Sequence, residues 1–221
     1  MINIINADCN SVIEELKHTH TQLIMVTDPP FNIGYKYRSY RDKMNENEYF
    51  SMLCRLTESI PFVLIHYPEQ LHKLSIALGE SPTKVCSWVY NSNTGKQHRD
   101  IAFYRIKPNM NQVKQPYKNQ TDKRIKALME NGSKGSRLYD WWNINQVKNV
   151  SKEKLNHPCQ MPIDVMTNVI GVLPKNATII DPFMGTGTTG MACKLLGLDF
   201  IGIELDEVYF RIAKERLQGC D

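Results

Sequence analysis

The sequence predicts an α/β domain built on a doubly wound, mostly parallel sheet. Short apolar runs alternate with longer segments in which apolar residues recur every three or four positions, which is typical of strands alternating with helices. A glycine-rich turn follows one apolar run near the end of the sequence, and an acidic residue ends the next run. The chain has 221 residues, a length that suits one domain with a sizeable core and one insertion.

The apolar runs and the helical spacings assign the elements in order. Strands are predicted at residues 2–6, 22–27, 61–66, 84–90, 100–106, 177–181 and 199–203. Helices are predicted near residues 9–17, 46–58, 68–79, 161–172, 188–196 and 206–217. The last two strands flank one helix, so they indicate a βαβ unit.

The alternation stops between residues 107 and 156. Asn, Gln, Lys and Pro dominate there, and a long structureless stretch inside a compact domain usually has a function. We therefore expect an insertion at 107–156, between a first half of the domain at 1–106 and a second half at 157–221.

Positive charge gathers in the same part of the chain. Residues 91–137 hold eleven Lys or Arg and three Asp or Glu, a net charge of +8. The whole chain carries +4, so the remaining residues carry −4. A solvated surface loop would also be charged, but a basic stretch of this kind favours a surface that binds a polyanion.

The composition argues against several other classes of protein. No apolar run approaches the roughly 20 residues of a membrane span. Residues 1–8 do not resemble a signal peptide, so we expect a cytoplasmic protein. The six cysteines are scattered without a Cys-x-x-Cys pair, so we expect reduced thiols and no metal site.

The glycine-rich turn from Asp181 to Gly190 is a candidate cofactor site. Its glycines allow a ligand to approach the backbone, and amides at the start of the following helix can face polar groups. Glu204 ends the next strand, where a carboxylate can accept hydrogen bonds from two ribose hydroxyls. The spacing suits a nicotinamide dinucleotide as well as S-adenosylmethionine. Asp181 would repel a pyrophosphate and attract a cationic methionine amine, which favours S-adenosylmethionine.

A second candidate site, Asp28-Pro29-Pro30-Phe31, follows the strand at 22–27. Two prolines fix an extended path whose carbonyls stay free to accept hydrogen bonds. An exocyclic amine such as adenine N6 becomes nucleophilic when its two N–H groups donate to the Asp28 carboxylate and the Pro29 carbonyl. Phe31 would stack on the base, which must leave the duplex to react. These four residues are the predicted catalytic residues.

Three motifs together resemble the β-class DNA amino-methyltransferases: Asp28–Phe31, Asp181–Thr189 and Asn156–Pro162. In that class, which is circularly permuted, the catalytic motif precedes the cofactor motif, as it does here. The resemblance covers nearly the whole chain. It implies a Rossmann-like methyltransferase sheet with a small basic recognition insertion, S-adenosylmethionine as cofactor, duplex DNA as partner and adenine N6 as the methylated atom.

The resemblance also implies cofactor contacts outside the glycine-rich turn. A carboxylate at the position of Asp8 contacts the adenine ring of the cofactor, and His157 and Gln160 help to line the pocket. The predicted cofactor-binding residues are Asp8, His157, Gln160, Asp181, Pro182, Phe183, Gly185, Gly187, Thr188 and Glu204.

Basic residues give the predicted DNA surface. In the loop at 32–43, basic and aromatic side chains alternate, as they do in loops that follow a phosphate backbone. The predicted DNA contacts are Lys36, Arg38, Lys96, Arg99, Lys118, Lys123 and Arg124. We interpret Trp141 and Trp142 as core packing. We assign no role to four histidines: His18, His20, His66 and His72.

Several alternatives stay open. Cytosine N4 is the second candidate acceptor, although enzymes of that type more often carry Ser-Pro-Pro. An RNA methyltransferase, a dinucleotide-dependent oxidoreductase and a catalytically silent DNA-binding module are the others. Cys159 lies in a Pro-Cys-Gln tripeptide like that of cytosine-C5 enzymes, but the tripeptide does not follow a strand, which favours chance. The target sequence, a homodimer and a partner restriction endonuclease are also left open.

Overall fold

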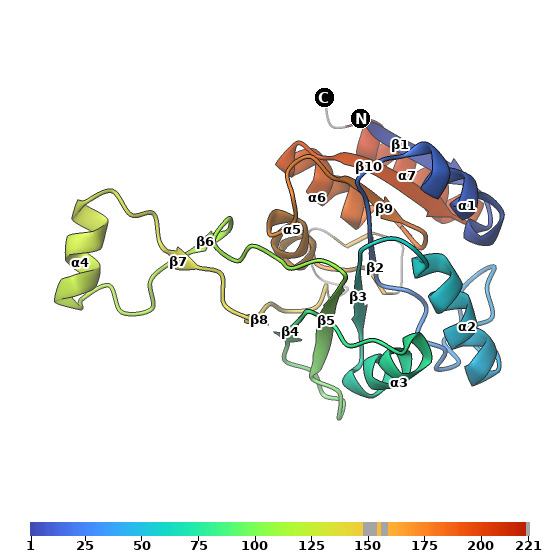
Figure 1. Ribbon diagram of the computed structural model, residues 1–221, viewed down its shortest axis with the longest axis horizontal. Helices are drawn as coiled ribbons and strands as arrows, with labels where there is room; N and C mark the ends of the chain where they lie inside the picture. Colours follow the sequence, from blue (N-terminus) through green and yellow to red (C-terminus); the bar gives the residue numbers. More distant parts are fainter. Residues whose placement is uncertain (148–153, 156–158, 220–221) are drawn as a thin grey trace.

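The computed structural model describes residues 1–147, 154–155 and 159–219, and an eight-stranded sheet forms the centre of this part of the chain (Figure 1). The strands lie in the order β1-β10-β9-β2-β3-β5-β4-β8. Their bounds are β1 (Ile2–Asn6), β2 (Leu23–Thr27), β3 (Phe62–His66), β4 (Lys84–Val89), β5 (His98–Tyr104), β8 (Trp141–Asn143), β9 (Thr178–Asp181) and β10 (Asp199–Glu204).

The sheet is mostly parallel, as predicted. Strands β1, β10, β9, β2 and β3 pair in parallel, whereas β5 runs antiparallel to both β3 and β4. Every residue of β2 and β3 is buried, because both faces of the central sheet are covered. The structure therefore confirms the predicted class, a doubly wound, mostly parallel α/β sheet.

Helices cover the two faces in two groups of three. Strand residues alternate between the groups: Leu23 and Met25 belong to one buried cluster, and Ile24 and Val26 belong to the other. The first cluster contains residues of α1 (Cys9–Thr19), α2 (Glu46–Thr57) and α3 (Pro68–Leu78). The second contains residues of α5 (Ile163–Gly171), α6 (Thr188–Leu196) and α7 (Glu207–Gln218). Among the described residues, no helix combines the length and apolar character that crossing a membrane requires.

The topology places four strand ends at one edge of the sheet. From β9 the chain passes through α6 to β10 on one side, and from β2 it passes to β3 on the other side. Because these strands are parallel, their carboxyl ends meet at the same edge. Thr27, His66, Asp181 and Glu204 are the last residues of β2, β3, β9 and β10. A cleft between β9 and β2 at this edge is the usual place for a ligand in such sheets.

The segment at 107–156 contains regular structure, contrary to the sequence-based expectation. Strands β6 (Lys114–Gln115) and β7 (Ser136–Arg137) pair and carry α4 (Lys123–Glu130), and together they form an arm that projects from the sheet (Figure 1). Helix α4 has only eight residues and none of them is buried, so its apolar spacing is too short to predict a helix. Strand β8 belongs to the main sheet, because it pairs with β4. The boundaries of the three predicted segments stay predictions.

Candidate functional site

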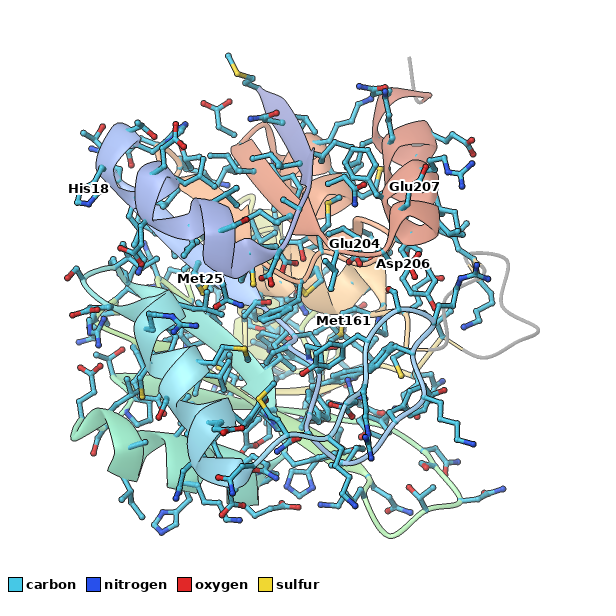
Figure 2. The ribbon with its side chains drawn as sticks, turned by 90° about the vertical axis from the view of Figure 1, so that its right-hand side faces the viewer. His18, Met25, Met161, Glu204, Asp206 and Glu207 are labelled. Atoms are coloured by element: carbon cyan, nitrogen blue, oxygen red, sulfur yellow. The ribbon has the colours of Figure 1, made fainter. Side chains whose placement is uncertain are left out.

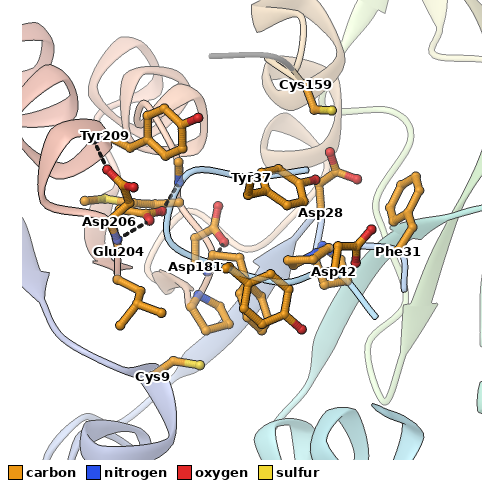
Figure 3. A pocket seen from close by; sticks show the side chains of 18 of the residues that line it. Cys9, Asp28, Phe31, Tyr37, Asp42, Cys159, Asp181, Glu204, Asp206 and Tyr209 are labelled. Carbon is orange, nitrogen blue, oxygen red and sulfur yellow. Dashed lines mark hydrogen bonds between the residues drawn. The ribbon is translucent and has the colours of Figure 1, made fainter. Parts of the chain in front are cut away.

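A cavity of about 590 Å³ opens at the carboxyl edge of the sheet. It is lined by the Asp28–Phe31 motif, by most of the glycine-rich turn and by Glu204, so it joins the two motifs that are far apart in the sequence. Figure 2 shows Glu204, Asp206 and Met161 near the centre of the molecule, and all three line this cavity. Figure 3 shows Asp28 and Phe31 on one side of it and Glu204 on the other, with Asp181 between them.

Asp28 follows β2 and points its carboxyl group into the cavity (Figure 3). One oxygen, Oδ2, lies 3.5 Å from Nη1 of Arg99. The other oxygen, Oδ1, is buried and has no hydrogen-bond partner within the described part of the chain. A buried acceptor without a donor is costly, so Oδ1 lacks a hydrogen bond that a folded protein usually supplies.

The charge of Asp28 is set by opposing effects. Burial raises the pKa of this carboxyl group from 3.8 to about 7, because the charged form is poorly solvated. The Arg99 guanidinium lowers the pKa and the nearby Asp181 raises it. The Asp28 carboxyl group therefore titrates close to neutral pH.

Arg99 does not lie on an exposed basic surface, unlike the other predicted DNA contacts. It lies on β5, next to β3 in the sheet, and only 12% of its side chain is exposed. Its guanidinium carbon lies 4.8 Å from the ring centre of Phe31 and 5.3 Å from that of Trp88. Arg99 falls in the basic stretch of the sequence, which predicts a surface cation, whereas the pairing of β5 with β3 places it next to Asp28.

Phe31 is buried against a histidine that has no assigned role in the sequence analysis. The rings of Phe31 and His66 stack with centres 4.2 Å apart. Nδ1 of His66 accepts a hydrogen bond from the Tyr67 backbone N–H, so Nε2 carries the proton and donates to the Tyr49 hydroxyl at 2.8 Å. Burial lowers the pKa of His66 to about 3, so the ring is neutral. The feature of the sequence that could have indicated a place for His66 in the site is its position at the end of a predicted strand.

The glycine-rich turn connects β9 to α6 and lies against Glu204. Gly185 has a left-handed backbone with φ +54°, and its N–H donates to Oε2 of Glu204 at 2.9 Å. Oε1 of Glu204 accepts from the Asp206 N–H at 2.8 Å. Each oxygen keeps a second lone pair for a ligand. Burial raises the pKa of Glu204 to about 7.

Asp181 is buried at the start of this turn. It accepts hydrogen bonds from the hydroxyls of Thr27 at 2.8 Å and Thr189 at 2.5 Å, and from the Phe183 N–H at 3.1 Å. Burial raises its pKa to about 6, and these three hydrogen bonds oppose that rise. Asp181 therefore ties β2, β9 and α6 together beneath the cavity.

The other predicted cofactor-binding residues are placed as follows. Those that line the cavity are Asp8, Gln160, Pro182, Phe183 and Thr188. Gly187 does not line it: its Cα faces α7, and an added Cβ would lie 3.2 Å from Leu217. Its left-handed backbone, φ +79°, still requires a glycine at the turn into α6. His157 lies outside the described residues.

The loop at 32–44 covers one side of the cavity and is organised by Asp42, which the sequence analysis did not identify. The buried Asp42 carboxylate accepts from the backbone N–H groups of Asn32, Ile33 and Tyr35, at 2.7, 3.2 and 3.1 Å. Ser39 donates to Oδ2 of Asp206 at 2.7 Å, which joins the loop to the N-terminus of α7. Three tyrosines of the loop line the cavity: Tyr35, Tyr37 and Tyr40.

Cys159 also lines the cavity, near Asp28 (Figure 3). Burial raises the pKa of its thiol, and the Asp28 charge raises it further. A cytosine-C5 nucleophile must be a thiolate, which this environment disfavours. No group of three or more His, Cys, Asp or Glu is placed to hold a metal ion in the described ranges.

The remaining predicted DNA contacts lie on the surface. Exposed side chains belong to Lys36, Arg38, Lys96, Lys118, Lys123 and Arg124. Lys118 is on the arm, and its Nζ lies 4.4 Å from the ring centre of Trp141. Trp141 is 45% exposed, so the interpretation as core packing is wrong for Trp141, whereas Trp142 is buried as expected. The two residues differ because successive residues of β8 face opposite sides.

The fold and the cavity together define a Rossmann-like methyltransferase. Comparisons with known proteins give the family. Residues 73–215 match the N6/N4 family model described as DNA methylase. The chain therefore belongs to this family and is a DNA methyltransferase.

Individual relatives agree with this assignment. The Type II methyltransferase M.HpaI of Haemophilus parainfluenzae is 27% identical over 96% of this chain and 73% of its own length. The Type II methyltransferase M.ScaI of Streptomyces caespitosus is 30% identical over 94% of this chain and 79% of its own length. The crystal structure of the M1.HpyAVI-SAM complex covers 98% of this chain and 100% of its own, with a TM-score of 0.62 and 25% identity.

Proposed function

We propose that this protein transfers the methyl group of S-adenosylmethionine to N6 of adenine in duplex DNA, as a circularly permuted, β-class enzyme. The observation that carries the proposal is the unsatisfied, buried Oδ1 of Asp28 in the same cavity as Glu204 and the glycine-rich turn. The order of the motifs along the chain supports the β class. The Asp-Pro-Pro motif supports adenine over cytosine N4, because N4 enzymes more often carry Ser-Pro-Pro.

The cavity residues suit the cofactor. Glu204 keeps lone pairs for ribose hydroxyls, and Asp8 and Phe183, which also line the cavity, would contact the adenine ring. The buried carboxylate of Asp181 supplies negative charge beside the glycine-rich turn, where a methionine amine is cationic. When bound, the cofactor supplies an electrophilic methyl group on a sulfonium.

The protein prepares the amine as a nucleophile. Oδ1 of Asp28 accepts one N–H of the amine and the Pro29 carbonyl accepts the other, which localises the nitrogen lone pair and aims it at the methyl group. Bound S-adenosylmethionine would supply the methyl group to this nitrogen, and the electron pair of the methyl–sulfur bond would remain on sulfur. The methylated ammonium would give one proton to water. Positioning supplies much of the rate, because both reactants are held in one cavity.

The test is an assay of the modified base. The purified protein is incubated with S-adenosylmethionine and bacterial genomic DNA, the DNA is hydrolysed to nucleosides, and these are analysed by mass spectrometry. We expect N6-methyladenine with wild-type protein and none with Asp28→Ala. N4-methylcytosine in its place would contradict the choice of base. Methylation of RNA but not DNA, or a melting temperature raised by NAD but not by S-adenosylmethionine, would contradict the proposed function.

A further inference from the structure

Arg99 leaves a buried hydrogen-bond donor unsatisfied next to the unsatisfied acceptor of Asp28. Three buried side-chain atoms lack a hydrogen-bond partner in the part of the chain that the structure describes. One is on the arm, at Gln115, and the other two are Oδ1 of Asp28 and Nε of Arg99. Both residues line the cavity, and their side chains contact each other through Oδ2 and Nη1 at 3.5 Å.

The orientation of Arg99 is fixed by aromatic rings. Its guanidinium lies 4.8 Å from the ring centre of Phe31, 5.3 Å from that of Trp88 and 5.7 Å from that of Tyr67. The ring contacts use none of the N–H groups of Arg99. The guanidinium also bonds to Tyr90 and contacts Asp28, but Nε has no hydrogen-bond partner in the described part of the chain. An unpaired donor on Arg99 and an unpaired acceptor on Asp28 therefore belong to contacting side chains that line one cavity.

A buried acceptor beside a buried donor matches one kind of nucleobase edge. Adenine and cytosine present an amine that donates, next to a ring nitrogen that accepts. Guanine and thymine present a carbonyl that accepts next to a ring N–H that donates, so the same pair of protein atoms would face them acceptor to acceptor and donor to donor. A site with fixed polar groups rejects bases that leave those groups unpaired.

We propose that Arg99 recognises the target base by donating a hydrogen bond from Nε to the ring nitrogen beside the amine that Asp28 holds. This inference rests on the proposed function, because it concerns the base on which the methyl group is placed. It assigns the predicted DNA contact of Arg99 to the target base inside the cavity. In adenine the acceptor is N1 or N7, since both flank the amine.

The test removes the acceptor from the DNA and the donor from the protein. Single-turnover methylation at saturating S-adenosylmethionine is measured on duplexes in which the target adenine is replaced by 1-deazaadenine, 7-deazaadenine or 3-deazaadenine. Loss of one hydrogen bond to a charged group predicts that the wild-type rate falls about 10-fold to 100-fold on the 1-deaza or the 7-deaza duplex. The 3-deaza duplex lacks a nitrogen remote from the amine, so it is the control.

Variants separate recognition from a purely electrostatic effect of Arg99 on Asp28. Arg99→Met removes charge and donor, so we expect slow methylation of adenine and no further loss on the sensitive analogue. Arg99→Lys keeps the charge, so its pH profile should match that of the wild type. Because it lacks Nε of Arg99, it should not discriminate between adenine and that analogue. Lys84→Met removes a cation of β4 outside the cavity and should behave as wild type. Binding of S-adenosylmethionine verifies that each variant is folded.

The possible results are distinguishable. Equal wild-type rates on adenine, 1-deazaadenine and 7-deazaadenine would overturn the role of Arg99 while leaving the proposed function intact. The same holds if Arg99→Lys restores the wild-type rate and discrimination, because charge alone would then suffice. A wild-type protein that binds S-adenosylmethionine but methylates no adenine in DNA would overturn the proposed function itself.

Discussion

Asp28 carries a carboxyl group that burial pushes towards the neutral form and Arg99 pushes towards the charged form. The proposed chemistry needs the charged form, because only a carboxylate offers lone pairs on both oxygens without carrying a proton of its own. The environment of Asp28 therefore couples the reaction to pH.

Replacing Asp28 separates the catalytic carboxylate from the neighbouring thiol. Asp28→Ala removes the acceptor for the amine, so we expect methyl transfer to fall below detection while S-adenosylmethionine still binds. Cys159→Ser should keep most of the activity, because burial disfavours a Cys159 thiolate. Transfer of labelled methyl groups to DNA measures the activity of each variant. Calorimetric titration with S-adenosylmethionine measures cofactor binding. The reverse pattern of activities would reject the assignment of Asp28.

The pH dependence follows from the raised pKa of Asp28. Because its carboxyl group titrates at about 7 in the free protein, kcat/KM for DNA should rise as pH increases through about 7 and level off above it. Below this pH the proton on Asp28 blocks acceptance of the amine N–H. Initial rates between pH 5.5 and 9, at saturating S-adenosylmethionine, check this. A rate that falls across this range would contradict the requirement for a carboxylate.

At the scale of elements, each predicted strand and helix ends within two residues of its observed bounds, whereas the three-residue β8 of the same sheet was not predicted. Strands β2 and β3 are continuous apolar runs because both of their faces are covered, and the helices beside them show apolar residues at helical spacing. The elements of the arm were not predicted because they are short. Its strands have two residues each and α4 has eight, so the apolar spacing in them is too brief to indicate a strand or a helix.

The loop at 32–44 depends on the Asp42 carboxylate for its conformation. Asp42→Ala would leave three loop N–H groups without an acceptor, so we expect a loss of about 1–3 kcal/mol of folding free energy. The Michaelis constant for S-adenosylmethionine should also rise, because the loop contacts Asp206 beside the cavity. Thermal unfolding and initial rates measure the two effects. Lys43→Ala changes an exposed residue of the same loop and should alter neither. An unchanged Michaelis constant for Asp42→Ala would show that the loop does not shape the cofactor site.

At the scale of the whole molecule, the basic arm extends away from the sheet (Figure 1). The cavity, in contrast, lies at the carboxyl edge of the strands. Lys118, Lys123 and Arg124 are exposed on this arm. Cations outside the cavity bind DNA through its phosphates, which adds affinity but carries no choice of base. We therefore expect affinity for DNA to depend on the arm, and the choice of base to depend on the cavity.

Replacing the basic residues of the arm by neutral ones tests whether DNA affinity depends on the arm. Replacing Lys118, Lys123 and Arg124 together by Gln should weaken DNA binding and lower the slope of log Kd against log salt by about 0.9 for each phosphate that the arm no longer neutralises. Binding of S-adenosylmethionine should not change. Lys175→Gln removes an exposed cation before β9, at the amino edge of the sheet, and is the matched control. An unchanged salt dependence in the triple variant would exclude the arm from the DNA surface.

The sequence by itself determined the alternation of strands and helices, the class of sheet and the two motifs of the site, because each depends on local patterns of apolar residues, glycine and proline. The tertiary structure alone decided which distant side chains meet at the site. Arg99 faces Asp28 because β5 pairs with β3, and His66 stacks on Phe31 because β3 ends beside β2. Such contacts join residues tens of positions apart, and no spacing along the chain encodes the order of strands in the sheet.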